Sequence, residues 1–319
     1  MVQVLISGAA GFIGSHYVDR LLRDGYSVVG VDNFITGDRG NLSHLKGVKE
    51  WRFVEADATA IDFVSRMTEL GPFDVVLHLA SLASPKDYLN HPLETLESGS
   101  TATRNMLEIA LRFEARFLVT STSECYGDPL EHPQKETYWG NVNPIGPRSC
   151  YDESKRYAEA LTMAYHRKYG LRTNIARIFN TYGPRMKLND GRVVPAFLSQ
   201  ALEGHPLTMF GDGTQTRSFC YVDDLIDGLC RLMLSDEREP VNLGNPQEIT
   251  LLEFAERIQR LLGTSCPIEF HPLPEDDPTR RQPDISKAKR VLGWVPGYGL
   301  EAGLAPTVEY FQGKLAARR

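Results

Sequence analysis

The stretch "VQVLISGAAGFIGSHYVDRLLRDG", residues 2–25, decides the fold. A β-branched apolar run leads directly into "GAAGFIG", and apolar residues then recur near the helical period until Gly25. Gly8, Gly11 and Gly14 lie between this strand and helix. The missing side chains permit a tight turn, close approach of the backbone to a pyrophosphate, and tight helix packing. The stretch therefore predicts a βα unit that binds a dinucleotide.

A carboxylate follows the second predicted strand at the position that contacts the ribose in such units. Asp32 lies eighteen residues beyond Gly14, where it can accept hydrogen bonds from a ribose diol and would repel a 2′-phosphate. NAD is therefore predicted rather than NADP. Asp57, after the third strand, is a candidate adenine contact, although a solvated strand-end aspartate explains it nearly as well.

Apolar strand-like runs alternate with helical stretches through the first half of the chain. The runs after the first cover residues 26–32, 53–57, 74–81, 116–122 and 173–180. Strands that are apolar on both faces and separated by helices indicate a parallel sheet with helices on both sides. We predict an α/β fold, a Rossmann-type doubly wound parallel sheet with a smaller, interleaved C-terminal α/β substrate domain.

The pattern changes after about residue 185, where proline, glycine and charge become denser. The segments 211–219 and 275–284 are interpreted as loops, whereas 221–234 is typical of a helix and 240–245 of one more strand. The predicted division of the chain is as follows: the NAD-binding Rossmann domain covers 1–185, with 220–245 returning to it, and the nucleotide-sugar-binding domain covers 186–219 and 246–319.

The composition excludes several classes of partner. A net charge of −6 argues against a nucleic-acid or anionic-membrane surface as the main partner, and no apolar run approaches the roughly 20 residues of a membrane span. The five cysteines are an odd set without CxxC spacing, so neither a disulfide framework nor a metal site is indicated. The N-terminus lacks the basic region of a signal peptide. We expect a cytoplasmic protein.

Candidate catalytic residues occur in two further segments. Tyr151 and Lys155 are four residues apart at the start of a predicted helix, so both side chains emerge on one face. A nearby ammonium and a positive nicotinamide ring would favour the phenolate and lower the tyrosine pKa towards that of a useful base. Thr122, in "TSTSECYG" (120–127), can bond the substrate hydroxyl that Tyr151 deprotonates.

Together these motifs resemble the extended short-chain dehydrogenase/reductase family of nucleotide-sugar enzymes, over essentially the whole chain. Within that family, "STSECYGDP", "NPIGPRSCYDESKR", "RIFNTYGPRM", "NDGRVV" and "GDGTQTRSF" are most similar to the UDP-glucuronate decarboxylases. Thr122, Glu124, Tyr151 and Lys155 are then the expected catalytic residues, and Tyr151 and Lys155 also contact the cofactor. We further place Phe12, Ile13, Asn33, Ala58 and Leu79 in the cofactor site.

The residue before Glu124 bears on the reaction. In the related dTDP-glucose 4,6-dehydratases the motif reads Thr-Asp-Glu, and the aspartic acid protonates the departing hydroxyl. Ser123 stands there in this chain, and a serine hydroxyl is a poor general acid. The 4-epimerases generally lack a carboxylate at the position of Glu124. The resemblance therefore implies oxidation at C4, decarboxylation of the resulting β-keto acid, protonation at C5 and reduction, with Glu124 orienting the ring and a proton-donating water.

The resemblance also implies the substrate contacts. Arg281, next to Arg280 in the late loop, matches the arginine that contacts the sugar carboxylate, and Tyr88 and Ser123 are expected near the sugar. The residues expected around the nucleotide diphosphate are Asn180, Arg185, Gln215 and Arg217.

Several alternatives stay open from the sequence. A dTDP-glucose-type 4,6-dehydratase in which Glu124 does both tasks is the closest rival, a UDP-glucuronate 4-epimerase is another, and a non-catalytic dinucleotide sensor is remote. Leu82 and Cys125 depart from the family pattern, in which proline and valine are usual. By analogy, helices around 95–113 and 152–169 would form a homodimer through a four-helix bundle.

Overall fold

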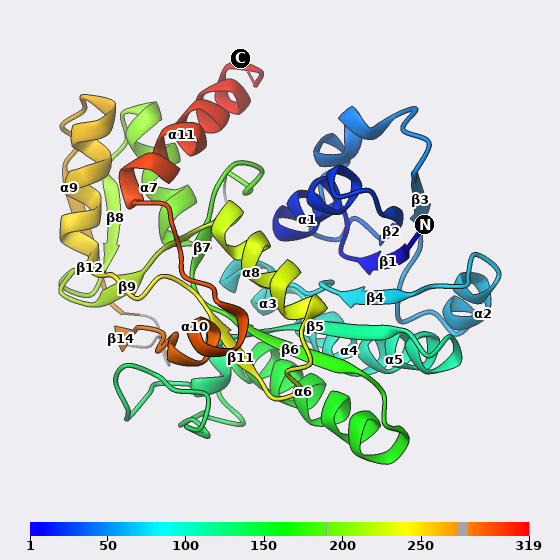
Figure 1. Cartoon of the computed structure of the whole chain (residues 1–319). Coiled ribbons are helices and arrows are strands. Elements are labelled where there is room, and N and C mark those ends of the chain that lie inside the picture. The colour runs from blue at the N-terminus through cyan, green and yellow to red at the C-terminus, as the bar shows by residue number, and fades with distance from the viewer. Residues whose placement is uncertain (189, 274–279, 319) are drawn as a thin grey trace.

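A seven-stranded parallel sheet forms the centre of the protein (Figure 1). The computed structural model describes residues 1–188, 190–273 and 280–318. The strand order is β11-β6-β5-β4-β1-β2-β3. The strands are β1 (Gln3–Ser7), β2 (Ser27–Asp32), β3 (Trp51–Glu55), β4 (Val75–His78), β5 (Arg116–Thr122), β6 (Thr173–Ile178) and β11 (Val241–Leu243). The order reverses between β1 and β4, which opens a crevice at the carboxyl ends of these strands.

Helices cover both faces of the sheet, as predicted. In Figure 1, α1 (Phe12–Arg23) and α8 (Val222–Leu234) lie above the sheet, and α5 (Thr103–Arg112) and α6 (Ser149–Tyr169) lie below it. Alternate residues of β1 pack on opposite faces of the sheet: Val4 and Ile6 belong to one buried core and Leu5 belongs to the other. The short helix α2 (Phe63–Thr68) belongs to the second side. The doubly wound fold predicted from the apolar strands is confirmed.

Two helices of the central fold, α1 and α6, end close to a glycine. After α6, Gly170 adopts a left-handed φ of 69°, and Gly25 after α1 has a φ of 85°. A residue without Cβ accepts this conformation at no steric cost. α6 begins at Ser149, so Tyr151 lies in its first turn, at the start of the helix as predicted.

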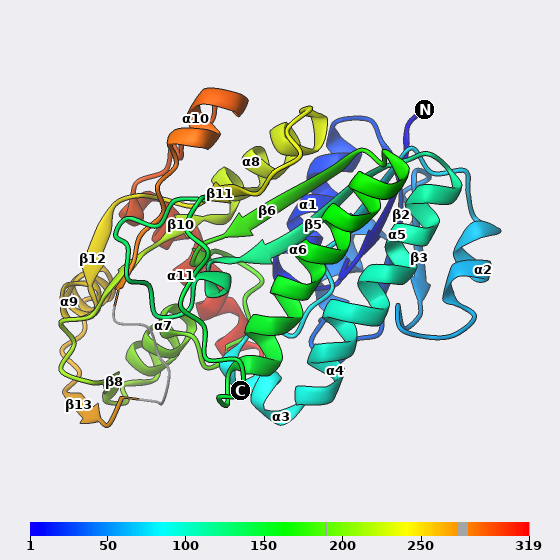
Figure 2. The same cartoon turned by 90° about the horizontal axis from the view of Figure 1, so that it is seen from below.

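Three consecutive helical segments run beside α6: α4 (Pro92–Glu97), the π-helix η2 (Ser98–Ala102) and α5. Figure 2 shows this row next to α6. Gly99 permits the close approach, because a Cβ at this position would lie 2.5 Å from the Ser154 carbonyl oxygen. The contact lies between Tyr151 and Lys155 along α6, so it fixes the part of the helix that carries both side chains.

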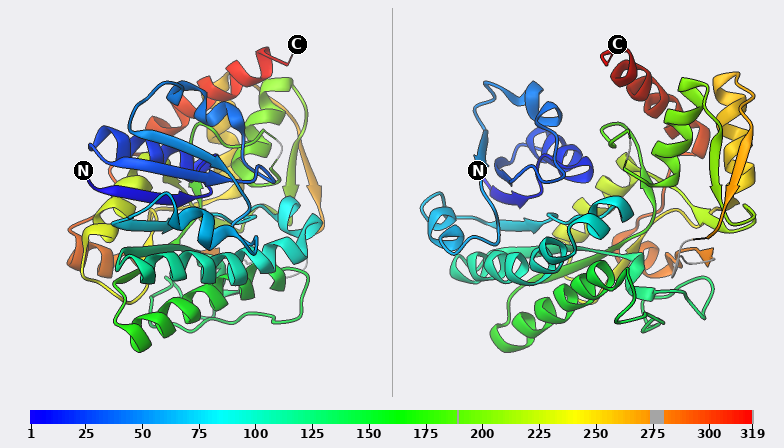
Figure 3. Two further views of the ribbon diagram at one scale, coloured as in Figure 1. Left: turned by 90° about the vertical axis from the view of Figure 1, so that its right-hand side faces the viewer. Right: turned by 180° about the vertical axis from the view of Figure 1, so that it is seen from behind.

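The rest of the chain forms a second group of elements beside the sheet. It contains α7 (Val193–Glu203), α9 (Leu251–Leu262) and α11 (Leu300–Ala316), which lie together at one side in Figure 3. Parallel strands β8 (Leu207–Phe210) and β13 (Ile268–His271) accompany them. The remaining elements are β7 (Thr181–Tyr182), β10 (Cys220–Tyr221), α3 (Pro85–Asn90), α10 (Ser286–Leu292), η1 (Arg39–Leu45) and η3 (Ser123–Tyr126).

Two segments interpreted as loops contain short strands, so that interpretation was wrong in part. β9 (Thr216–Ser218) pairs with β12 (Glu248–Thr250) on one side and with β14 (Arg280–Arg281) on the other. These strands exist because of partners distant in the sequence, a feature that local composition does not reveal. Residues 275–279 of the second predicted loop lie outside the described residues. No helix in the described ranges is long and apolar enough to cross a membrane.

Candidate active site

The glycine-rich turn between β1 and α1 forms one wall of the crevice. Gly8 has a φ of 76°, and a Cβ there would lie 2.7 Å from the Ala80 backbone nitrogen. A Cβ on Gly14 would lie 1.9 Å from the Gly8 carbonyl oxygen. Gly11 is the N-cap residue of α1, so the unpaired N–H groups of that helix face the crevice. A diphosphate fits such a helix terminus.

Two adjoining cavities follow this turn. The first is lined by Asp32, Asn33, Asp57 and Ala58, and the second by Phe12, Ile13 and Gly14. Gly8, Gly11 and Leu79 line both, so the two form one continuous cleft. The structure therefore brings the predicted cofactor residues of the crevice together, whereas Tyr151 and Lys155, on α6, line neither cavity.

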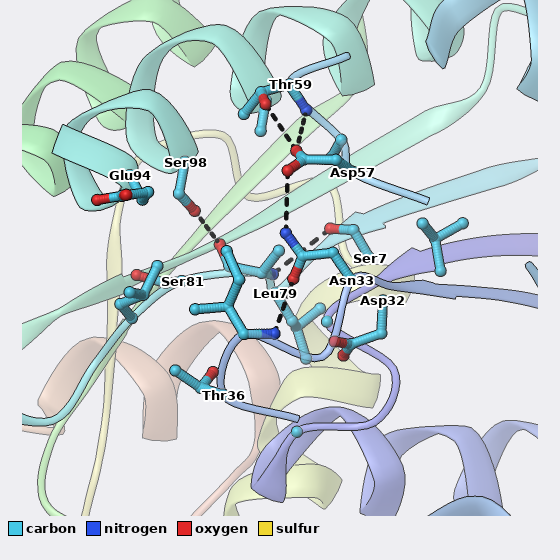
Figure 4. A pocket seen from close by; sticks show the side chains of 18 of the residues that line it. Ser7, Asp32, Asn33, Thr36, Asp57, Thr59, Leu79, Ser81, Glu94 and Ser98 are labelled. Atoms are coloured by element: carbon cyan, nitrogen blue, oxygen red, sulfur yellow. Dashed lines mark hydrogen bonds between the residues drawn. The ribbon is translucent and has the colours of Figure 1, made fainter. Parts of the chain in front are cut away.

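Figure 4 shows the first cavity. Asp32 accepts hydrogen bonds from Ala10 N (2.9 Å) and Phe34 N (2.8 Å), and burial raises its pKa. Both carboxylate oxygens keep further acceptor capacity for a ribose. Asn33 Nδ2 donates to Asp57 Oδ2 (3.1 Å), so these two predicted residues act as one unit.

Charge is divided between the two cavities. The ionisable residues of the first are all acidic, namely Asp32, Asp57, Glu94 and Glu97. The second is lined by five cations, Arg185, Lys187, Arg192, Lys314 and Arg318, and by three carboxylates, Asp38, Asp87 and Asp190, so its charge is positive on balance. An acidic end disfavours a 2′-phosphate and a basic end suits a diphosphate, so the cleft fits NAD at the first cavity and phosphate groups at the second.

Tyr151 and Lys155 emerge from the first two turns of α6 as predicted. A hydrogen bond joins Tyr151 to the Thr122 side chain, and Lys155 Nζ donates to the Thr120 carbonyl oxygen (2.8 Å). Burial lowers the pKa of Lys155 to about 8. Burial raises the pKa of Tyr151, and the Thr122 hydrogen bond offsets part of that rise. In the protein without NAD, the pKa of Tyr151 is therefore not lowered as predicted, because the effect of burial exceeds that of the neighbouring groups.

Glu124 is held by two arginines. Its Oε1 lies 2.9 Å from Arg281 Nη1 and its Oε2 lies 2.9 Å from Arg148 Nη2. Burial alone would raise the Glu124 pKa, but Arg281 and Arg148 outweigh it and lower the pKa to about 2. Arg281 Nη1 also donates to Ser123 Oγ (2.9 Å). The expected substrate arginine thus already binds a carboxylate of the protein, whereas its buried Nε has no hydrogen-bond partner among the described residues.

Tyr88 lies against the candidate base. Its ring stacks on Tyr151 with centroids 5.2 Å apart and an interplanar angle of 8°. Tyr88 is 1% exposed, and its hydroxyl has no hydrogen-bond partner in the described part of the chain. A buried hydroxyl without a partner is costly, so this atom is available to a bound sugar.

The predicted diphosphate contacts are spread over two regions. Arg185 lines the second cavity and its Nη2 donates to Asp19 Oδ2 on α1 (2.7 Å). Gln215 donates to the Phe210 carbonyl, and Arg217 Nη1 donates to the Thr216 carbonyl (2.9 Å). These two lie near β14, since Arg217 is the strand partner of Arg281.

Asn180 is the remaining predicted diphosphate contact. It follows β6, and its carbonyl accepts a hydrogen bond from Cys220 N (2.9 Å). This bond leads from the central sheet into the second group of elements.

A buried polar network that sequence reasoning missed positions Arg281. Gln134 Oε1 accepts from Gln282 N (2.9 Å), and its backbone N donates to the Gln282 carbonyl (2.9 Å). Asn242 Nδ2 donates to the Gln134 carbonyl (3.0 Å), while its Oδ1 accepts from Tyr126 OH (2.8 Å). Gln134 and Asn242 are fully buried. No sequence signal marks them, because the partners are far apart along the chain.

Arg148, in contrast, has a recognisable spacing in the sequence, although it is not among the predicted site residues. It precedes Tyr151 by three residues, so both belong to the start of the same helix. Arg192 is a second omission, since it lines the second cavity and its charge lowers the pKa of Tyr151.

Comparisons with known proteins agree with this geometry. Residues 4–244 match the NAD dependent epimerase/dehydratase family. The chain is 51% identical to UDP-glucuronic acid decarboxylase 1 of Arabidopsis thaliana over 314 residues, which cover 98% of this chain and 71% of that protein. The chain belongs to the NAD-dependent epimerase/dehydratase family, so the resemblance predicted from the motifs is confirmed, as is NAD as the cofactor.

Two solved structures are similar throughout. One is the UDP-glucose 4-epimerase of Thermotoga maritima with UDP-glucose, with a TM-score of 0.90, 31% identity and coverage of 98% of this chain and 100% of that chain. The other is the UDP-glucuronic acid 4-epimerase of Bacillus cereus with UDP-glucuronic acid and NAD, with a TM-score of 0.86, 30% identity and the same coverage.

Proposed function

We propose that this protein is an NAD-dependent UDP-glucuronate decarboxylase that forms UDP-xylose through a UDP-4-keto sugar. The observation that carries the proposal is the arrangement at the end of β5, where an ionised Glu124 and the hydroxyl of Ser123 share Arg281. No carboxylic acid stands at the position that protonates a leaving hydroxyl in the dehydratases. About half of the residues of this chain are identical in relatives named UDP-glucuronic acid decarboxylase.

The residues of the chain perform the proton transfers and the positioning. Bound NAD⁺ would supply the hydride acceptor for oxidation at C4 and the hydride donor for the final reduction. Tyr151 takes the proton of the C4 hydroxyl, and Thr122 holds that tyrosine in place. The 4-keto group then delocalises the electron pair that carbon dioxide leaves behind. Lys155 contributes a positive charge near the ring of Tyr151, with its Nζ 5.9 Å from the ring centroid.

The substrate carboxylate is assigned to the arginines at Glu124. Arg281 is 1% exposed and its Nε has no partner within the described residues, so this donor is available inside the site. Arg148 is the second guanidinium at the same carboxylate. Two cations around one protein carboxylate leave a net positive charge for a second carboxylate.

The nucleotide diphosphate is assigned to two arginines and two amide side chains. Asn180, Arg185, Gln215 and Arg217 keep that role in the proposal, and residues 186–219 and 246–319 would form the nucleotide-sugar-binding domain. The segment 220–245 would belong with the NAD-binding domain 1–185, because it supplies α8 and β11 to the central sheet.

One assay separates decarboxylation from its rivals. Purified protein is incubated with UDP-glucuronate and NAD⁺, and the product is identified by mass and stereochemistry. Release of carbon dioxide with a UDP-pentose supports the proposal. An unchanged mass with inverted C4 means epimerisation, and conversion of dTDP-glucose to a 4-keto-6-deoxy sugar means dehydration. Either result overturns the proposal.

Tyr151→Phe is expected to abolish turnover while NAD stays bound, which distinguishes an enzyme from a dinucleotide sensor.

We further propose a homodimer through α4 to α5 and α6. Large side chains on these helices are exposed in the single chain, namely Leu93 (70%), Leu96 (40%), Tyr157 (41%) and Tyr169 (48%). Sedimentation should give the mass of two chains, and the double variant Leu96→Glu with Tyr157→Glu should give the mass of one.

A reducing compartment such as the cytoplasm is also proposed, because all five cysteines are unpaired. Cell fractionation tests this location.

A further inference from the structure

Asp152 is a buried carboxyl group that the mechanism above does not use. It follows Tyr151 directly in the first turn of α6 and is 6% exposed. Its Oδ1 has no hydrogen-bond partner among the described residues. A carboxylate in such a place is costly unless it is protonated or bonded to a ligand. Three other buried polar atoms of the site also lack partners there, the Tyr88 hydroxyl, Arg281 Nε and Arg185 Nη1.

Charged groups from several elements surround Asp152. The groups that act on it are Glu124 of η3, Arg148 before α6, Arg281 of β14 and Glu153 of its own helix. The charge of Asp152 also raises the pKa of Tyr88 on α3 and of Tyr151. Asp152 therefore lies within electrostatic reach of the base, of the stacked tyrosine and of both arginines at Glu124.

The environment drives Glu124 and Asp152 to opposite protonation states. Burial raises the pKa of Asp152, and the neighbouring Glu124 raises it further, to about 7, against the opposing effect of Arg148 and Arg281. The arginines instead hold the pKa of Glu124 at about 2. Two carboxyl groups whose pKa values are pushed apart in this way commonly divide the roles of acid and base.

The proposed reaction needs a proton at C5, and neither Tyr151, Glu124 nor the arginines at Glu124 supply it. When the bond between C5 and the carboxyl carbon breaks, carbon dioxide leaves and the electron pair stays on the sugar, so C5 must gain one proton. The proton on Tyr151 came from the C4 hydroxyl and must return to that oxygen when the ketone is reduced. Glu124 is ionised, and an arginine is not deprotonated in proteins.

We propose that Asp152 stores the proton that decarboxylation consumes and releases it towards C5 through a water held at Glu124. The substrate carboxylate departs as carbon dioxide, the C5 anion takes up the proton, Asp152 is left as a carboxylate, and a proton from solvent restores it. This inference rests on the proposed decarboxylase function. It deepens that function by assigning the source of the C5 proton.

The test compares Asp152→Asn with the wild type on UDP-glucuronate. An amide keeps the size of the side chain and removes its proton. We expect kcat to fall by about 10²-fold, a usual contribution of a positioned proton donor. We also expect bound NADH to accumulate, seen by its absorbance, because reduction must wait for protonation at C5. The part of the alkaline fall of kcat that comes from ionisation of Asp152 should be absent from the variant, which leaves only the fall at higher pH where Lys155 loses its proton.

Glu153→Gln is the matched control, because Glu153 is the next residue on α6, is 40% exposed and pairs with Arg156. It should keep the wild-type rate and show no NADH accumulation, with at most a small shift of the alkaline limb, because Glu153 has the smallest effect of the charges that act on Asp152. Wild-type rate and pH profile in Asp152→Asn would overturn the inference. A slow variant without NADH accumulation would overturn it as well, since the defect would then precede decarboxylation. Failure of the wild type to release carbon dioxide would instead refute the proposed function.

A second measurement does not depend on turnover. The raised pKa of Asp152 makes its ionisation unfavourable in the folded state, so folding stability should fall as the pH rises through about 7. The asparagine of Asp152→Asn cannot ionise. The melting temperature of this variant relative to that of the wild type should therefore be higher at alkaline pH than at mildly acidic pH. An equal difference at both pH values would mean that Asp152 does not hold a proton near neutrality, and the inference would be wrong.

Discussion

Arg281 Nη1 lies 2.9 Å from Glu124 Oε1, although 157 residues separate the two in the sequence. The contact joins the end of β5 in the central sheet to β14 in the second group of elements. The carboxyl group proposed to work beside C5 and the guanidinium proposed to bind the uronate are therefore one ion pair before any substrate enters.

Glu124→Gln should destabilise the protein at neutral pH by about 3–5 kcal/mol, because it leaves two largely buried arginines without their counter-charge. The folded pKa of about 2 is below the ordinary 4.5, so the contribution of the carboxylate is complete above pH 4.5 and disappears as the pH falls towards 2. Urea unfolding of both proteins at neutral and acidic pH measures this. A difference that persists unchanged in acid would contradict the ion-pair assignment.

Thr122→Val should shift the pH dependence of catalysis. The hydrogen bond from Thr122 lowers the pKa of Tyr151, so its loss raises that pKa. Because the base must lose its proton, the acidic limb of the kcat/KM profile should move to higher pH, with a loss of about 10-fold or more at neutral pH. Thr122→Ser keeps the hydroxyl and is the control. An unshifted profile in the valine variant would show that Thr122 does not act on Tyr151.

Gln134→Leu should weaken the placement of Arg281. The substitution leaves Gln282 N without its acceptor, and a buried unsatisfied group costs about 1–3 kcal/mol. We expect a lower kcat and a higher KM for UDP-glucuronate, with the affinity for UDP nearly unchanged, because UDP has no uronate carboxylate. Calorimetry with UDP and steady-state kinetics test this. Equal losses for UDP and UDP-glucuronate would point to general disruption instead.

Lys314→Ala should accelerate the release of NAD. Lys314 on α11 lies 3.1 Å from Asp38 after β2, and both residues line the second cavity. This ion pair therefore spans the cleft between the sheet and the second group of elements. Both side chains are partly exposed, and such pairs contribute about 0–1 kcal/mol, so release should be faster by up to about fivefold. The release rate is measured with NADH, whose fluorescence changes when it leaves the protein.

The charge-swapped pair tests the cause of that change. Asp38→Lys combined with Lys314→Asp should restore slow release, and high salt should reduce the difference between wild type and Lys314→Ala. Single-variant rates equal to the wild-type rate would show that the pair does not retain the cofactor.

Much of the fold could be predicted from local sequence patterns. Continuous apolar strands, helical periodicity and the glycines after helices are short-range features, because each depends on neighbours within a few residues. They predicted the seven central strands and the helices between them. The β9 and β14 strands were missed because they exist through pairing with distant segments.

The candidate site divides in the same way. The sequence by itself determined the glycine turn, Asp32, and the Tyr151 and Lys155 spacing, since one strand, one turn or one helix sets each of them. Only the tertiary structure decided that Glu124 is paired with Arg281 and Arg148, and that Asp152 is buried beside them. The physical reason is that charge pairing and desolvation depend on which distant segments meet, and these two effects fix the protonation of the site.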